Sequence, residues 1–284
     1  MSQSAATRFP EEEFDQVDRA NASGKQPVLF VHGLWLLDSS WEHWAQFFED
    51  AGYVAVTPKW ADDHEGARRA REHPEALAYR NIADVAAHQQ AVIERLDRKP
   101  ALIGHSFGGL LVQILAGRGL AAVTVAIDPA SRGVLPASLA AAKAAAPILT
   151  HHGHRRRAVA LTFEQFRYGF ANALSKDEAR QMYDAYRVDR SIVPITQAGI
   201  ADLDHHSDAD ADEKPGGRGP MLIISGELDH QVPPAIVHAT YGRQGMNPGL
   251  TQFLEVKDRG HSLTIDSGWR DVARISLDFI HRFV

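Results

Sequence analysis

One serine in the sequence has the surroundings of a nucleophile. Ser106 lies between Gly104 and Gly108 in the stretch GHSFG, which has the form G-x-S-x-G. This pattern suits a sharp turn from a strand into a helix, where the serine is held in a strained conformation and larger flanking residues would collide. Because the pattern alone is weak, its context matters. An apolar strand-like run precedes it and an apolar helix-like run follows it, which favours a nucleophile over a structural turn.

A serine nucleophile needs a general base, and only position distinguishes the fifteen histidines of the chain. His261, in DRGHSL, follows the last expected strand and precedes the last expected helix. The base in turn needs a carboxylate that orients it. Asp229, in GELDHQVPP, and Asp128, at the end of VTVAID, both follow strands and both lie between Ser106 and His261 in the chain. Asp229 is preferred because its loop is expected beside that of His261, and Asp128 remains the competitor.

An acyl-transfer site also needs two backbone N–H groups directed at the oxyanion that develops on the carbonyl oxygen. One is expected from Phe107, directly after the serine. The other is expected from the loop that follows the run PVLFVHG, and most simply from Leu34. Trp35, in the same loop, is expected to contact the substrate, as is the side chain of Phe107.

The elements that must position these residues alternate along the chain. Short apolar runs occur at PVLFV, YVAV, ALIGH, VTVAI, MLIIS and TQFLEV, and helical patterns separate most of them. Such runs suit strands that are buried on both faces. The pattern predicts an α/β fold with a mostly parallel, doubly covered sheet, whose site lies at the carboxyl ends of the strands. Residues 1–26 are polar and are expected to form an N-terminal arm with little regular structure.

The alternation stops between residues 130 and 215. This stretch has helical patterns and no convincing strand, so we expect a helical cap inserted between two parts of the sheet core, 27–129 and 216–284. A capping box of Ser175 and Glu178 should open one cap helix. The cap aromatic residues either line an apolar pocket or, as we expect for most of them, hold the cap helices on the sheet. They are Phe163, Phe166, Tyr168, Phe170, Tyr183 and Tyr186.

Composition narrows the class of protein. Of 284 residues, 44% are hydrophobic and 23% are charged, as in ordinary globular enzymes, and the net charge of −6 argues against binding along nucleic-acid phosphates. No signal peptide or membrane span is recognisable, and the absence of cysteine excludes disulfides and thiolate metal sites. We therefore expect a cytoplasmic enzyme with a small-molecule substrate and neither a nucleic-acid nor a membrane partner. A homo-oligomer is compatible with this composition.

Two histidine groups raise the question of a metal or anion site. His151, His152 and His154 are interpreted more simply as a solvated face of the cap. His205 and His206 lie in an acidic loop of a kind that usually binds nothing specific, although such a loop can chelate a cation. Neither a metal nor a cofactor is expected.

Together these motifs resemble the α/β-hydrolase fold superfamily, from residue 27 to residue 284. VHGL, GHSFGG, GELDHQVP and DRGHSL fall in the family's order and spacing, and the chain is further similar to small bacterial esterase-like serine hydrolases with a helical cap. The resemblance implies one role for each candidate: nucleophile Ser106, base His261, acid Asp229, and oxyanion donors Leu34 and Phe107.

Two features depart from the family's pattern. The antiparallel first strands common in the family are not recognisable in residues 1–26, so a shorter sheet is expected. The loop HGLWLLDSSW lacks the proline that follows the HG dipeptide in many relatives that cleave epoxides or carbon–halogen bonds.

The serine at position 106 suits acyl transfer, whereas those relatives use a carboxylate nucleophile at the equivalent place. We predict a serine hydrolase that cleaves a carboxylic ester or lactone of a small to medium apolar substrate through an acyl-enzyme on Ser106. The resemblance leaves one alternative, a lyase or a cofactor-free peroxidase or oxygenase with the same fold and triad. A third hypothesis is a non-catalytic receptor, which the intact Ser106, Asp229 and His261 disfavour.

Overall fold

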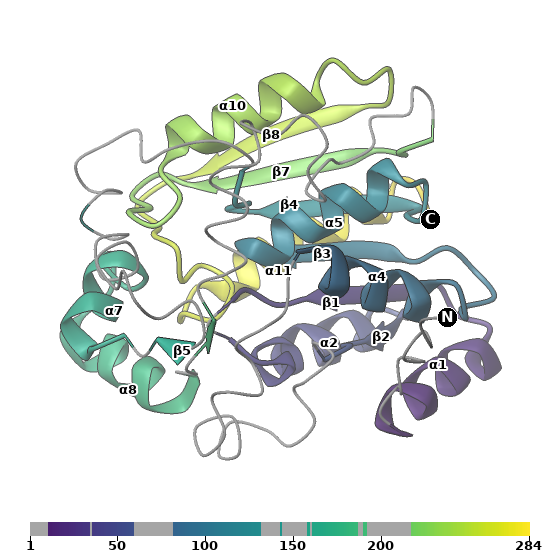
Figure 1. The fold of residues 1–284 in the computed structure, drawn as a ribbon, viewed down its shortest axis with the longest axis horizontal. Helices are drawn as coiled ribbons and strands as arrows, with labels where there is room; N and C mark the ends of the chain where they lie inside the picture. The colour runs from purple at the N-terminus through teal and green to yellow at the C-terminus, as the bar shows by residue number, and fades with distance from the viewer. Residues whose placement is uncertain are drawn as a thin grey trace, which may run out of the picture.

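A single parallel sheet organises the part of the chain that the structure describes. The computed structural model describes residues 11–34, 36–59, 82–131, 143, 158–159, 161–186, 190–191 and 217–284. Within these ranges, six strands form a sheet in the order β2-β1-β3-β4-β7-β8, and every neighbouring pair is parallel (Figure 1). They are β1 (Pro27–Val31), β2 (Val54–Val56), β3 (Ala101–His105), β4 (Val123–Ile127), β7 (Met221–Gly226) and β8 (Thr251–Val256).

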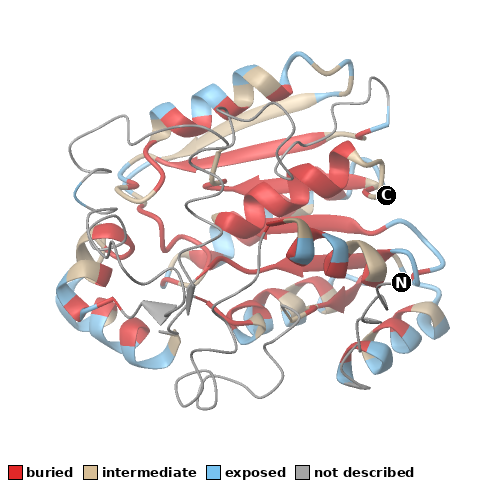
Figure 2. Cartoon of the chain, viewed as in Figure 1, coloured by how far each residue is buried: buried red, intermediate tan, exposed pale blue. Residues whose placement is uncertain are grey.

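Helices cover both faces of this sheet, because alternate side chains of each strand point to opposite sides. In β1, Leu29 and Val31 join one core cluster with helices α1, α4, α5 and α10, while Val28 and Phe30 join another with α2 and α11. The central strands and α5 are buried almost throughout (Figure 2). The helices are α1 (Glu11–Ser23), α2 (Glu42–Asp50), α4 (Ile82–Ile93), α5 (Phe107–Gly117), α7 (Phe163–Gly169), α8 (Lys176–Tyr186), α10 (Pro234–Gln244) and α11 (Trp269–Ile280), with a 3-10 turn η1 (Asp38–Trp41) before α2.

This architecture confirms the predicted α/β class with a parallel, doubly covered sheet. Its register matters for the site, since His105 at the end of β3 pairs with Ile127 at the end of β4. The turns that follow these strands therefore begin at the same level of the sheet. In the described ranges, no helix combines the length and the apolar character that crossing a membrane requires.

The N-terminal segment corrects one expectation. Residues 11–23 form helix α1 rather than an irregular arm, and Val17 and Ala20 are buried against the core. The carboxylate of Glu13 is also buried, and it accepts hydrogen bonds from the backbone N–H of Lys59 and from the ring of His88. With a buried acid and only two small core contacts, the helix has a weak apolar pattern, which explains why the sequence suggested an arm.

The inserted segment agrees with the expectation only in part. Helices α7 and α8 lie together at one end of the sheet (Figure 1). However, Ala158–Val159 (β5) and Arg190–Ser191 (β6) pair as a short antiparallel ladder where no strand was expected. Two residues are too few to produce a strand pattern. The boundaries of the cap at residues 130 and 215 stay a prediction, because most of this segment lies outside the described residues.

The capping box expected at α8 is only half formed. Ser175 Oγ accepts the backbone N–H of Glu178 at 3.2 Å, as predicted. The carboxylate of Glu178 instead accepts the backbone N–H of Ser267 at 2.9 Å, in the segment that follows β8. A complete capping box opens α7, between Thr162 and Gln165. Helix α8 is thus joined to the β8–α11 segment by the side chain that was expected to cap it.

Candidate active site

The serine turn has the strained backbone that the motif predicts. Ser106 joins β3 to α5 with φ 57° and ψ −118°, in the region that residues other than glycine seldom occupy. Such a conformation costs of order 1–3 kcal/mol, so neighbouring contacts must hold it. The backbone N–H of Ser106 donates to Ile127 O at 2.9 Å, and its carbonyl accepts from Ala130 N at 2.9 Å. Strand β4 and the residues after it therefore fix the turn on both sides.

The two glycines of the motif allow this turn to pack. A Cβ atom added to Gly104 would lie 2.2 Å from the carbonyl oxygen of Gly108. One added to Gly108 would lie 2.1 Å from the carbonyl oxygen of Val31, on β1. Both distances are far below any permitted contact. The sequence expectation that side chains at these positions would collide is confirmed, and it extends to the neighbouring strand.

Three of the predicted site residues come together at the carboxyl ends of the strands. His261 Nε2 lies 2.9 Å from Ser106 Oγ, and His261 Nδ1 lies 2.6 Å from Asp229 Oδ2. Since a carboxylate only accepts, Nδ1 carries the hydrogen and Nε2 is left to accept the serine proton. His261 and Asp229 are buried, whereas Ser106 is partly exposed. This arrangement can deprotonate the serine hydroxyl where a substrate can reach it.

The pKa of the His261 imidazole suits the transfer of the serine proton. Burial lowers the pKa of the His261 imidazole to about 4, so the ring is neutral at neutral pH and can act as a base. Burial also raises the pKa of Asp229, and the hydrogen bond from Val232 N, the neighbouring carboxyl group of Asp128 and the hydrogen bond from Gln231 N oppose this rise. The two backbone groups donate to Asp229 Oδ1 at 2.8 and 2.7 Å, which leaves Oδ2 for the imidazole.

The competitor Asp128 occupies a different place. It is fully buried at the end of β4, with φ 40°, and its Oδ1 accepts the backbone N–H of Gly226 at 2.7 Å. Its carboxyl group contacts the carboxyl group of Asp229. The structure therefore places Asp229 on the imidazole Nδ1, with Asp128 behind it.

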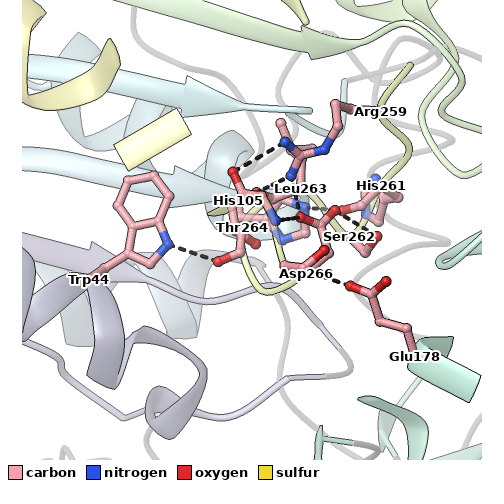
Figure 3. Close-up of polar contacts among 11 residues, drawn as sticks. Trp44, His105, Glu178, Arg259, His261, Ser262, Leu263, Thr264 and Asp266 are labelled. Atoms are coloured by element: carbon pink, nitrogen blue, oxygen red, sulfur yellow. Dashed lines mark hydrogen bonds and ion pairs between the residues drawn. The ribbon is translucent and has the colours of Figure 1, made fainter. Parts of the chain in front are cut away.

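A histidine inside the serine motif holds the backbone of the base. His105 Nε2 donates to the carbonyl oxygen of His261 at 2.9 Å, and the two ring centroids lie 4.6 Å apart (Figure 3). Burial, and then the proximity of His261, keep the pKa of His105 well below its usual range, so its ring is neutral too. The sequence does not indicate this contact, because the partner of His105 is a backbone atom 156 positions away.

The loop that carries His261 is closed on itself. Arg259 forms an ion pair with Asp266 and donates to Gly268 O at 3.1 Å (Figure 3). From α2, Trp44 Nε1 donates to Thr264 O at 2.8 Å. These contacts fix the loop at its base and at its tip. Sequence reasoning named neither Arg259 nor Asp266, and their spacing of seven residues is not a signal by itself.

The two predicted oxyanion donors lie beside the serine. Phe107 is the first residue of α5, where the helix dipole favours negative charge. A Cβ atom on Gly33 would lie 3.3 Å from Ser106 Cβ, so the loop that continues into Leu34 passes against the serine. Both Leu34 and Phe107 are buried. Their role as donors stays a prediction.

Other predicted positions fall outside the described residues. These are Trp35, expected to contact the substrate, and the histidines for which a metal or anion site was considered, namely His151, His152, His154, His205 and His206.

The aromatic residues expected in the cap mostly pack against one another, in a cluster separate from the two that cover the sheet. Phe163, Phe166, Phe170 and Tyr183 are buried in one cluster with Leu36, from the loop after β1. The Phe170 ring also lies edge-on to His261, 5.1 Å between centroids. Tyr168 differs, because it lines a hollow of about 490 Å³ with Lys143, Glu164, Gln165, Arg167, Asn172 and His230. Ser106 is not among the residues of that hollow.

Comparisons with known proteins agree with this fold. The sequence profile described as "Alpha/beta hydrolase family" matches residues 28–275. No curated protein sequence matches the chain. Solved structures similar to it include a monoacylglycerol lipase from Paleococcus ferrophilus, with 18% identity, a TM-score of 0.64 and coverage of 91% of this chain and 95% of that one.

Two further solved structures resemble the chain with similar identities and TM-scores. An extracellular alpha/beta-hydrolase from a Paenibacillus species has 18% identity, a TM-score of 0.64, and coverage of 89% of this chain and 98% of that one. A pyrethroid hydrolase from Sphingobium faniae JZ-2 has 17% identity, a TM-score of 0.61, and coverage of 90% and 97%. At these identities the similarity concerns the fold alone.

Proposed function

Because this chain belongs to the alpha/beta hydrolase family, we propose that it is a serine hydrolase that cleaves carboxylic esters or lactones of small to medium apolar substrates. Its sheet and helices form the fold of that family, as the sequence predicted. The observation that carries the proposal is the continuous hydrogen-bonded line from Asp229 through His261 to Ser106. Residues far apart in the sequence come together there in an arrangement that suits acyl transfer.

In the proposed reaction, each of these groups has one role. His261 Nε2 takes the proton of Ser106 as Oγ attacks the carbonyl carbon, and Asp229 stabilises the imidazolium that forms. The backbone N–H groups of Leu34 and Phe107 hold the oxyanion, and each such donor contributes about 3 kcal/mol to transition-state stabilisation. His261 then protonates the leaving group, and water repeats the sequence on the acyl-enzyme.

The apolar surroundings support the proposed substrate class. The ring of Phe170 packs against His261 and links it to the buried cluster of α7 and α8. Apolar walls with a few convergent polar groups are typical of sites for apolar ligands. The names of two similar structures, a monoacylglycerol lipase and a pyrethroid hydrolase, agree with such a substrate. In this proposal residues 130–215 act as the cap of a cytoplasmic enzyme, and Trp35 contributes to the pocket.

A substrate panel tests the proposal. Nitrophenyl esters of increasing acyl length and a set of lactones are offered to the wild type and to Ser106→Ala, and a fluorophosphonate probe reports the reactivity of Ser106. We expect turnover of several panel members and labelling of Ser106, both lost in Ser106→Ala. Full turnover in that variant would contradict the proposed mechanism. Labelling of Ser106 without turnover of any ester or lactone would instead favour a lyase or a cofactor-free peroxidase or oxygenase.

A further inference from the structure

The proposed reaction leaves one buried carboxyl group unused. Asp128 is 0% exposed at the end of β4, and Gly226 N–H donates to its Oδ1. Its other oxygen, Oδ2, is buried and accepts no hydrogen bond from any N–H or hydroxyl group in the described part of the chain. Leaving a buried acceptor without a donor costs about 1–3 kcal/mol. The environment of Asp128 Oδ2 must therefore account for this cost.

The neighbours of Asp128 are known from each element packed against it. His105 comes from β3, Asp229 from the loop after β7, and His261 from the loop after β8, and polar atoms of His105, Asp128 and His261 lie within 4.8 Å of one another. The His105 Nε2 hydrogen is directed at a backbone carbonyl, and both nitrogens of His261 are engaged with Asp229 and Ser106. Among the described residues, no lysine or arginine influences the charge of Asp128. Of these neighbours, the carboxyl group of Asp229 is within hydrogen-bonding contact of Asp128, whereas His261 acts on Asp128 through its charge.

Two carboxyl groups in contact, buried and without a cation, cannot both be charged. The environment decides which of them keeps the proton. Asp229 accepts three hydrogen bonds, from two backbone N–H groups and the imidazole, whereas Asp128 accepts one. Hydrogen bonds donated to a carboxylate stabilise its charged form. The charge therefore belongs on Asp229 and the proton on Asp128.

We propose that Asp128 is a protonated carboxylic acid that donates a hydrogen bond to the carboxylate of Asp229 and so positions Asp229 against His261. This role rests on the proposed function, and Asp128 is a positioning residue, since it touches neither substrate nor reacting atoms. Burial, followed by the charge of Asp229, raises the pKa of Asp128 well above its usual range, which supports the assignment of the proton. Protonated Oδ2 ceases to be an orphaned acceptor and becomes a donor.

The proton can be observed without any substrate. Infrared spectra in D₂O at neutral pD distinguish the carbonyl stretch of a protonated carboxyl from that of a carboxylate, and aspartate labelled with ¹³C at the side-chain carboxyl identifies the residue type. We expect a protonated aspartic acid band in the wild type and in Ser106→Ala, and its loss in Asp128→Asn. Absence of the band from the wild type, or its persistence in Asp128→Asn, would overturn the proposal.

Two variants of similar size test whether a donor is what the site needs. Asparagine at 128 can still accept from Gly226 N–H and donate through Nδ2 to Asp229, whereas leucine can do neither. We expect Asp128→Leu to lower kcat by about tenfold to a hundredfold with little change in KM, as one lost buried hydrogen bond predicts. Asp128→Asn should recover most of that loss. Asp128→Asn as impaired as Asp128→Leu would overturn the proposal, because the carboxyl group itself would then be required.

Each outcome is separable from the proposed function. If the wild type hydrolyses nothing in the panel, the proposed function fails, but the infrared band still reports the proton on Asp128. If esters are cleaved and the band is absent, only the role of Asp128 fails. If circular dichroism shows that Asp128→Leu does not fold, the infrared band and the rate of fluorophosphonate labelling in Asp128→Asn decide the question. We expect Asp128→Asn to be labelled at close to the wild-type rate. A loss of labelling as large as that of Asp229→Asn would contradict the positioning role of Asp128.

Discussion

Two buried pairs of a histidine with a carboxylate occur in the described part of the chain, and a described hydroxyl group is seen to face the histidine in one of them. In the first, His88 on α4 meets Glu13 on α1 at 3.1 Å. In the second, His261 meets Asp229 at 2.6 Å. Both pairs are almost completely buried, and each carboxylate also accepts backbone N–H groups. Burial and pairing alone therefore do not identify a catalytic histidine.

The difference lies in what each pair joins. Glu13 connects α1 to Lys59 and to α4, so the pair fastens the N-terminal helix to the sheet domain. Asp229 and His261 come from two loops at the carboxyl ends of the strands, and the second nitrogen of His261 is directed at a partly exposed serine in a strained turn. The third group and its access to solvent, more than the contact between histidine and carboxylate, therefore turn a structural pair into a candidate site.

The same substitution in each pair should separate the two roles most strongly. His261→Gln is expected to lower kcat/KM for a good ester substrate by about 10⁴-fold or more, because the general base is lost. His88→Gln should leave kcat/KM within about threefold while lowering the free energy of unfolding by about 3–5 kcal/mol, as breaking a buried pair does. Steady-state kinetics and urea unfolding measure both. An equal loss of activity in the two variants would refute the distinction.

Substituting the carboxylate of each pair tests the same comparison a second time. Asp229→Asn should reduce kcat by about 10⁴-fold, since an amide can stabilise the wrong imidazole tautomer and carries no charge. Glu13→Gln should reduce the midpoint of urea unfolding and leave kcat near the wild-type value. Asp229→Asn also separates the two aspartates. Retention of most activity in that variant would mean that Asp128 serves as the working acid.

The pH dependence of kcat/KM probes His261 in the folded enzyme. The base acts only when neutral, so activity is lost as the pH falls through its pKa, which burial lowers to about 4. We expect the midpoint of the acidic limb near 4 rather than near the ordinary histidine value of about 6.5. A midpoint at the ordinary value in protein that remains folded would contradict the desolvated base.

Folding must be followed in parallel, because burial lowers the pKa of both His105 and His261 in the folded state. Unfolding then takes up protons below about pH 6.5, so the free energy of unfolding should decrease as the pH falls from there. Circular dichroism at each pH distinguishes loss of the fold from protonation of the base.

The smallest expected effect concerns the contact between α8 and the loop of the base. Glu178→Ala removes the acceptor of Ser267 N–H, on an exposed part of the surface. We expect a loss of about 0.5–1.5 kcal/mol in the free energy of unfolding and less than a threefold change in kcat. Glu164→Ala, on the neighbouring helix α7, is the matched control. A tenfold loss of kcat in Glu178→Ala alone would mean that α8 aims His261.

The parts of the site that the sequence could predict are those with a local or topological signal. Ser106 was recognisable because the strand, the turn and the helix around it are contiguous, and both glycines serve the same turn. Asp229 and His261 could be placed because successive parallel strands bring their carboxyl ends to one edge. The same rule brought Asp128 to that edge, and only the side-chain geometry separates the two acids.

What the sequence could not predict depends on contacts across the chain. Glu13 looks like a solvated acid until the ring of His88, on another helix, is placed against it. The ion pair of Arg259 and Asp266 that closes the His261 loop corresponds to no periodic pattern in the sequence. The proton that we assign to Asp128 depends on the burial of both carboxyl groups without a lysine or arginine among their described neighbours, which is a property of the folded interior.

The closure of the loop by Arg259 has a consequence for how this protein could be remodelled. The tip and base of that loop are held by Trp44 and by the loop's own residues. Among the described residues of the insertion, Glu178 accepts from Ser267 N–H and the Phe170 ring packs against His261. The hydrogen bonds that orient the imidazole therefore come from outside the described part of the insertion. Chimaeras that keep Phe170 and Glu178 and carry a foreign sequence in the rest of the insertion should react with a small phosphonate at an undiminished rate, while their selectivity among bulky acyl groups changes. Specificity would then be exchangeable without rebuilding the catalytic groups.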